Sequence, residues 1–184
     1  MKKLLSILLL TVMLFTLVAC GGGDTTTTAA TTTTTTGPQK VYEKVPKQFS
    51  SSGMKITLTD AFIEATVPGY TVCYDSSDVA VVALKESFSL LAGLSGLSVE
   101  EYADLVHQSN ASKSPTAVTK LDGLTVFEYD FLNTDLNQTY SYLTVMYKGS
   151  DAFWTIQFST LKGQYTEYRP YLINWAKTVN VTGA

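Results

Sequence analysis

The sequence predicts an α+β domain, in which a twisted antiparallel sheet of about six strands is flanked by helices as an α/β/α sandwich. Two observations support this prediction. Four consecutive runs of strand-like sequence, joined by short turns, lie between residues 117 and 160. One helical apolar stripe precedes these runs and a second follows them. Helices that cover an antiparallel sheet form a layered domain around a shared core.

The N-terminus has the pattern of an export signal. A short basic start precedes an apolar run at residues 4–18, which is shorter than the roughly 20 residues of a spanning helix. The run ends in Leu17-Val18-Ala19-Cys20, which resembles the lipobox of bacterial lipoproteins. This resemblance implies that residues 1–19 are cleaved and that the Cys20 thiol carries a diacylglycerol. The alternative is a secretory signal that ends by chance in Ala-Cys.

Such an anchor would hold the protein permanently on the extracytoplasmic face of a bacterial cell membrane, because each buried methylene contributes about 0.8 kcal/mol. Residues 20–40 follow as a threonine-rich linker. Its tract at residues 25–36 has neither aromatic nor charged side chains and cannot form a core, so we predict a disordered spacer.

Residues 41–184 form the predicted single domain of 144 residues, large enough to bury about 70% of its unfolded surface. Loss of two signal lysines leaves 11 basic and 16 acidic residues, a net charge of −5. This balance argues against a nucleic-acid partner, which would favour a basic face.

Strand signals appear in order along the domain. The predicted strands lie at residues 55–58, 70–74, 79–88, 117–121, 124–132, 139–147 and 152–160. Residues 79–88 are apolar almost throughout, as in a strand covered on both faces. Asp122-Gly123 indicates a two-residue hairpin and residues 148–151 a second one, so the last four strands predict a meander.

Two helices are predicted around this meander. Ser98 and Glu101 form a capping box, and an apolar stripe of Val99, Tyr102, Ala103 and Val106 follows at helical spacing. The second helix is expected over residues 166–178, with Trp175 facing the sheet. Its start is set by Pro170, which is tolerated near the first turn of a helix.

These elements and their order resemble PsbP-like domains. The resemblance covers residues 48–182 and is carried by Ile56-Thr57-Leu58, Ser77-Asp78-Val79-Ala80-Val81, Glu100-Glu101-Tyr102-Ala103 and Phe153-Trp154-Thr155-Ile156-Gln157-Phe158. It implies a twisted antiparallel sheet between helices, and roles in binding more often than in catalysis. No metal or partner residue of that family is transferred to this chain.

Sequence motifs for catalysis are missing: the chain has no Gly-rich phosphate loop, Cys-x-x-Cys, His-Glu-x-x-His or Gly-x-Ser-x-Gly. Cys73 is interpreted as a buried free thiol; the alternative is a catalytic cysteine paired with His107, which we expect at the boundary of its helix.

Two acidic pairs occur. Asp75 and Asp78 are interpreted as part of a turn. Glu128 and Asp130 share one strand face and suit either a cation or solvent.

The connector between residues 88 and 97 is apolar and uncharged, and it contains Gly93 and Gly96. Connectors are usually polar, because they run over the protein surface. This apolar connector therefore either packs on the core as a helical turn or forms a contact surface. The candidate partner contacts are its four leucines, Leu90, Leu91, Leu94 and Leu97. The domain also holds 20 aromatic residues, eleven of them tyrosines, which are common in binding surfaces.

The sequence therefore predicts a lipid-anchored, extracytoplasmic binding or accessory domain without catalytic residues, metal or cofactor. Its expected partners are the membrane, through Cys20, and a protein or surface ligand of unknown identity. The alternatives are a small surface hydrolase that uses a carboxylate pair or Cys73, and a solute-binding lipoprotein. The latter is disfavoured, because 144 residues are too few for two lobes around a cleft.

Overall fold

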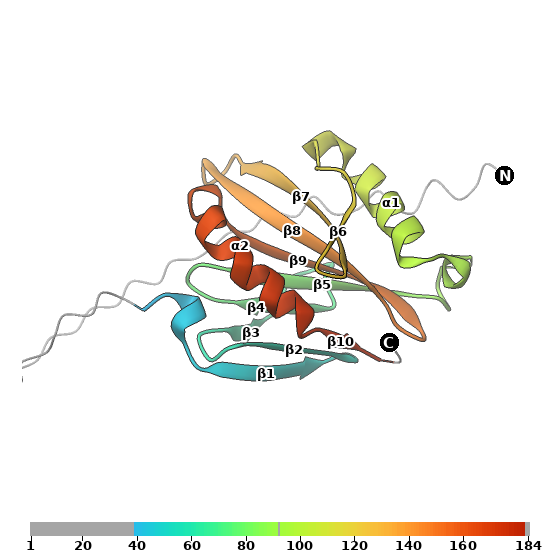
Figure 1. The fold of residues 1–184 in the computed structure, drawn as a ribbon, viewed down its shortest axis with the longest axis horizontal. Coiled ribbons are helices and arrows are strands. Elements are labelled where there is room, and N and C mark those ends of the chain that lie inside the picture. Colours follow the sequence, from blue (N-terminus) through green and yellow to red (C-terminus); the bar gives the residue numbers. More distant parts are fainter. Residues whose placement is uncertain (1–38, 92, 183–184) are drawn as a thin grey trace, which may run out of the picture.

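A seven-stranded antiparallel sheet dominates the computed structural model, which describes residues 39–91 and 93–182 (Figure 1). Its strands are β3 (Ile63–Ala65), β4 (Val72–Asp75), β5 (Ala80–Ser87), β6 (Thr119–Leu121), β7 (Leu124–Asn133), β8 (Gln138–Lys148) and β9 (Ala152–Leu161). Their spatial order is β3-β4-β5-β9-β8-β7-β6. The predicted meander is confirmed as β6 to β9, and β5 pairs antiparallel with β9.

The hairpin between β6 and β7 is the tight turn that the Asp-Gly pair predicts. Asp122 has a φ of 51° and Gly123 a φ of 87°, so both turn residues are left-handed. Two consecutive positive φ angles match the right-handed twist of the flanking strands and place Leu121 opposite Leu124.

A separate three-stranded sheet packs on the large one. It contains β1 (Pro46–Ser51), β2 (Met54–Thr59) and β10 (Asn180–Val181), with β2 in the centre. The predicted strand at residues 55–58 lies within β2, whereas β1, β3 and β10 were not predicted. In β1 only Phe49 is buried, so its sequence lacks the alternation that indicates a strand.

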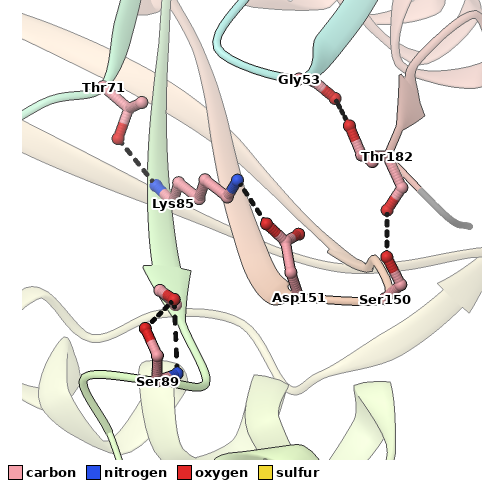
Figure 2. Close-up of polar contacts among 8 residues, drawn as sticks. Gly53, Thr71, Lys85, Ser89, Ser150, Asp151 and Thr182 are labelled. Carbon is pink, nitrogen blue, oxygen red and sulfur yellow. Dashed lines mark hydrogen bonds and ion pairs between the residues drawn. The ribbon is translucent and has the colours of Figure 1, made fainter.

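Polar contacts of Thr182, which follows β10, connect the end of the chain to turns of both sheets (Figure 2). The Thr182 hydroxyl donates to the Gly53 carbonyl at 3.0 Å, and the Ser150 amide donates to the Thr182 carbonyl at 3.0 Å. Nearby, the Lys85 ammonium on β5 pairs with the Asp151 carboxylate at 2.8 Å. The β1–β2 turn, the β8–β9 turn and the end of the chain are thereby connected.

The first predicted helix is confirmed as α1 (Val99–Ser109). The Ser98 hydroxyl accepts from the Glu101 amide at 3.1 Å, and the Glu101 carboxylate accepts from the Ser98 amide at 2.8 Å. Three residues of the predicted stripe, Tyr102, Ala103 and Val106, are buried. Short 3₁₀ turns occur at η1 (Val41–Glu43), η2 (Leu94–Gly96) and η3 (Ala111–Lys113).

The expected start of the second helix was wrong. Helix α2 (Lys162–Lys177) begins four residues before Thr166, which places Pro170 inside the helix rather than in its first turn. An internal proline costs about 3 kcal/mol, because it removes a hydrogen bond to the preceding turn. Here Pro170 is exposed, so water can solvate the freed carbonyl, while Tyr168 and Leu172 on either side are buried.

Two cores lie on opposite faces of the large sheet. The larger core packs the sheet against α2 and the three-stranded sheet, and it contains Trp154 and Trp175. The smaller core lies under α1, where Tyr102 stacks on Phe153 with ring centroids 4.1 Å apart. Helix α1 covers only part of its face, and the remainder of that face carries the candidate site.

Candidate functional site

A cleft of about 460 Å³ lies on the α1 side of the large sheet, beyond the area that α1 covers. Its floor comes from β5, β9, β8 and β7, and its walls include the turns at residues 75–78 and 133–134. Alternate side chains of a strand point to the same face of the sheet, which explains where the cleft lies. Tyr129 and Phe131 follow Phe127, which packs under α1, on the same face of β7.

Aromatic rings form one side of this cleft. Tyr129 and Tyr142 are cross-strand neighbours whose rings stack with centroids 4.8 Å apart at 7°. Phe131 lies opposite Tyr140 in the next pair along the same two strands. Tyr70 lines another part of the cleft. Five aromatic side chains therefore contribute to one concave surface.

Amide side chains form a second group in the cleft. The Gln157 amide nitrogen donates to the Tyr129 hydroxyl at 2.9 Å, and the Tyr140 hydroxyl donates to the Gln138 carbonyl oxygen at 2.9 Å. Gln164 and Asn133 also line the cleft. A primary amide presents donors and acceptors together, so these groups suit a ligand that both gives and receives hydrogen bonds.

Burial favours the neutral forms of three ionisable groups of the cleft, Tyr142, Asp75 and Lys113. Burial, together with the nearby Tyr70 and Tyr140, raises the pKa of Tyr142 to about 12. It also raises the pKa of Asp75, although a hydrogen bond from the Ser76 backbone lowers it in part. The pKa of the Lys113 ammonium is lowered by burial alone.

The structure separates Cys73 from His107. Cys73 belongs to a cross-sheet row that continues through Val82, Gln157 and Thr144 to Phe127. Four interstrand spacings of about 4.8 Å place the two ends of that row about 19 Å apart. The His107 ring packs edge-on against Phe127, and its Nε2 lies 3.0 Å from the Thr116 carbonyl.

Cys73 is buried, which confirms its interpretation as a buried free thiol. Burial and then the charge of Asp75 raise the pKa of Cys73 to about 11. At neutral pH the side chain is therefore a thiol and not the nucleophilic thiolate.

Glu128 and Asp130 point to the α2 side of the sheet, where basic side chains bind them. The Arg169 guanidinium donates to both oxygens of the Glu128 carboxylate, from Nε to Oε2 at 3.1 Å and from Nη2 to Oε1 at 2.7 Å. Lys162 lies 2.7 Å from Asp130. No cluster of three metal-ligating side chains occurs in the described ranges, and these two carboxylates are neutralised by protein cations.

The four connector leucines differ in their surroundings. Leu90 is 82% exposed, whereas Leu94 and Leu97 pack against the smaller core and Leu91 is half-buried. The Lys148 ammonium holds the connector by donating to the Leu97 carbonyl at 2.6 Å. The connector thus folds partly onto the core, and its role as a partner contact stays a prediction.

Cys20, the signal at residues 1–19 and the linker as far as residue 38 lie outside the described residues. Among the helices of the described ranges, none is long and apolar enough to cross a membrane.

The cleft was not predicted from the sequence, although the sequence contains a pattern that indicates an aromatic surface. Two pairs of aromatic residues at a spacing of two, Tyr129 with Phe131 and Tyr140 with Tyr142, each share a strand face. These pairs indicate aromatic surface, but they do not show that α1 stops short of it. That depends on the length and the docking position of the helix.

The fold is similar to the solution structure of cyanobacterial PsbP (CyanoP) from Synechocystis sp. PCC 6803. The TM-score is 0.50 at 12% sequence identity, over 80% of this chain and 98% of that chain. No family model matches the chain, and no curated protein does. At this identity the similarity concerns architecture alone. The chain therefore has the PsbP-like α+β fold that its element order predicts.

Proposed function

We propose that this chain is a lipid-anchored, extracytoplasmic binding or accessory domain that carries out no chemistry of its own. The observation that supports the proposal is the cleft, in which aromatic rings, amides and hydroxyls gather on one uncovered sheet face. A concave site with apolar walls and a few convergent polar groups is the usual form of a small-ligand site. Its volume of about 460 Å³ fits a small molecule or one end of a longer chain.

Neither catalytic alternative has the geometry that it needs. A nucleophile must lie within hydrogen-bond reach of its general base. Cys73, the nucleophile of the hydrolase alternative, is buried and far from His107.

Of the two carboxylate pairs, Glu128 and Asp130 are bound by basic side chains. Asp75 and Asp78 line the cleft, where the Asp78 carboxylate accepts from the Tyr168 hydroxyl.

The membrane attachment in this proposal rests on the lipobox-like sequence that ends at Cys20. Replacement of the lipid acceptor, Cys20→Ser, should move the protein from the membrane fraction to the medium or leave an uncleaved precursor. The measurement is fractionation of cells followed by intact-mass analysis. A Cys20→Ser protein that is cleaved and retained as well as the wild type would refute the anchor.

The binding role is tested by site-specific photocrosslinking on intact cells. A photoreactive residue at Gln138, on the exposed rim of the cleft, should give a discrete adduct of reproducible mass. The control places the same residue at Asn174, which is exposed on α2 on the opposite side of the sheet. No adduct at Gln138, or the same adduct at both positions, would contradict a binding role for the cleft.

A further inference from the structure

The arrangement of rings in the cleft limits the shape of its ligand. Tyr129 and Tyr142 stack on one another, and Phe131 and Tyr140 form the next cross-strand pair about two residues along. Tyr129 is only 6% exposed, so the accessible rings are those of the half-buried Phe131, Tyr140 and Tyr142. These three rings, on two paired strands, offer an elongated aromatic strip rather than a closed pocket around one ring.

The amides beside this strip define the polar part of recognition. Gln138 uses its carbonyl oxygen to accept from Tyr140, which leaves its amide nitrogen as a donor. Gln157 uses its amide nitrogen to donate to Tyr129, which leaves its carbonyl oxygen as an acceptor. A ligand hydroxyl both donates and accepts, so it can satisfy either group.

The charged groups of the cleft are largely occupied by protein partners. The Lys113 ammonium donates to the side-chain amide oxygen of Asn110 at 2.8 Å and lies 4.8 Å from the centre of the Tyr129 ring. The Asp78 carboxylate accepts from the Tyr168 hydroxyl. Asp75 is half-buried. The remaining polar side chains that line the cleft are serines, threonines, amides and tyrosines, so most groups available to a ligand are uncharged.

We propose that this cleft binds a neutral oligosaccharide, whose sugar rings lie on the aromatic strip and whose hydroxyls form hydrogen bonds with the adjacent amides. The inference rests on the proposed binding function of the same cleft. The C–H face of a sugar ring carries a slight positive charge and packs on the negative face of an aromatic ring. Sugar hydroxyls match amide side chains in both donor and acceptor capacity. An anionic chain would instead require unpaired basic side chains.

The test uses the mature chain with Cys20→Ser and three neutral probes, cellotetraose, maltotetraose and chitotetraose. Saturation-transfer NMR detects binding, and titration calorimetry measures the affinity. At least one probe should bind. Tyr140→Ala, which removes a ring of the strip, should weaken that binding by at least about tenfold. Tyr140→Phe keeps the ring and should weaken it less than Tyr140→Ala does.

The matched control is Tyr171→Ala. Tyr171 lies on α2 and stacks on Tyr42 with centroids 3.9 Å apart, so the control removes a stacked tyrosine on the other side of the sheet. This variant should bind the probe within about twofold of the wild type. Thermal melts of both variants show whether each is folded. If Tyr140→Ala does not fold, Tyr140→Leu, which keeps an apolar side chain but removes the ring, takes its place.

Binding of no probe, or equal weakening by the Tyr140 and Tyr171 variants, would overturn the oligosaccharide assignment. If the adduct at Gln138 is a polypeptide while no sugar binds, this inference fails and the binding function stands. If neither an adduct nor sugar binding is found, both fail.

Discussion

Trp175 on α2 allows a quantitative test of how that helix packs. Its side chain is 8% exposed, and its ring meets Phe62 edge-on with centroids 5.3 Å apart at 89°. A buried tryptophan removes about 150–250 Å² from water. At about 25 cal/mol per Å² this corresponds to about 4–6 kcal/mol of transfer free energy. Because surrounding groups relax, we expect Trp175→Ala to cost about 3–5 kcal/mol in unfolding free energy.

The assay is urea unfolding followed by circular dichroism, with a thermal melt in parallel. A loss of this size should lower the melting midpoint by about 10 °C in a domain of this length. Asn174→Ala is the control, because Asn174 is the exposed neighbour on the same helix and should change stability by about 0.5 kcal/mol or less. A Trp175→Ala cost under about 1 kcal/mol would mean that this face of α2 does not pack against the sheet.

The edge-to-face contact can be separated from burial by a double-mutant cycle. Phe62→Leu and Trp175→Leu, alone and together, keep both positions apolar and remove the ring pair. We expect a coupling free energy of about 0.5–1.5 kcal/mol between the two sites. Additive costs would show that the two rings do not interact beyond their burial.

Two further predictions concern the connector and the α2 face of the sheet. Leu94→Asp should lower the unfolding free energy by about 1–3 kcal/mol, because Leu94 packs on the smaller core, whereas Leu90→Asp should leave the melting midpoint unchanged. Equal melts of the two variants would contradict this packing. Burial raises the pKa of Glu128, but its hydrogen bonds from Arg169 and a tyrosine outweigh burial and hold that pKa below its usual range. Because the pKa of Glu128 is lower in the folded protein than in the unfolded chain, its ionised form stabilises the fold. This stabilisation is fully present above the unfolded pKa of about 4.3 and is lost as the pH falls through the folded pKa. The unfolding free energy, measured with urea between neutral pH and a pH of about 3, should therefore fall more steeply with acid in the wild type than in Glu128→Gln. The same pH dependence in both proteins would refute this role of Glu128.

Local rules predicted the elements that have strong local signals. The Asp122-Gly123 turn needs left-handed backbone at both residues, and the Ser98 box closes within one helical turn, so neighbouring residues suffice for each prediction. Local rules failed at Pro170. Its cost depends on whether the freed carbonyl is solvated and on what its neighbours bury, and both are set by the docking of α2.

The sequence by itself determined the α+β class, the meander and the first helix, because each depends on residues close together in the chain. The lipobox-like signal stays a prediction. Only the tertiary structure decided the second sheet, in which β10 joins β2 from more than a hundred residues away. It alone decided that Cys73 and His107 lie apart, and that aromatic residues of β7 and β8 face a cleft rather than a helix. These outcomes depend on how elements pack, and the free energy of packing is shared among residues distant in sequence.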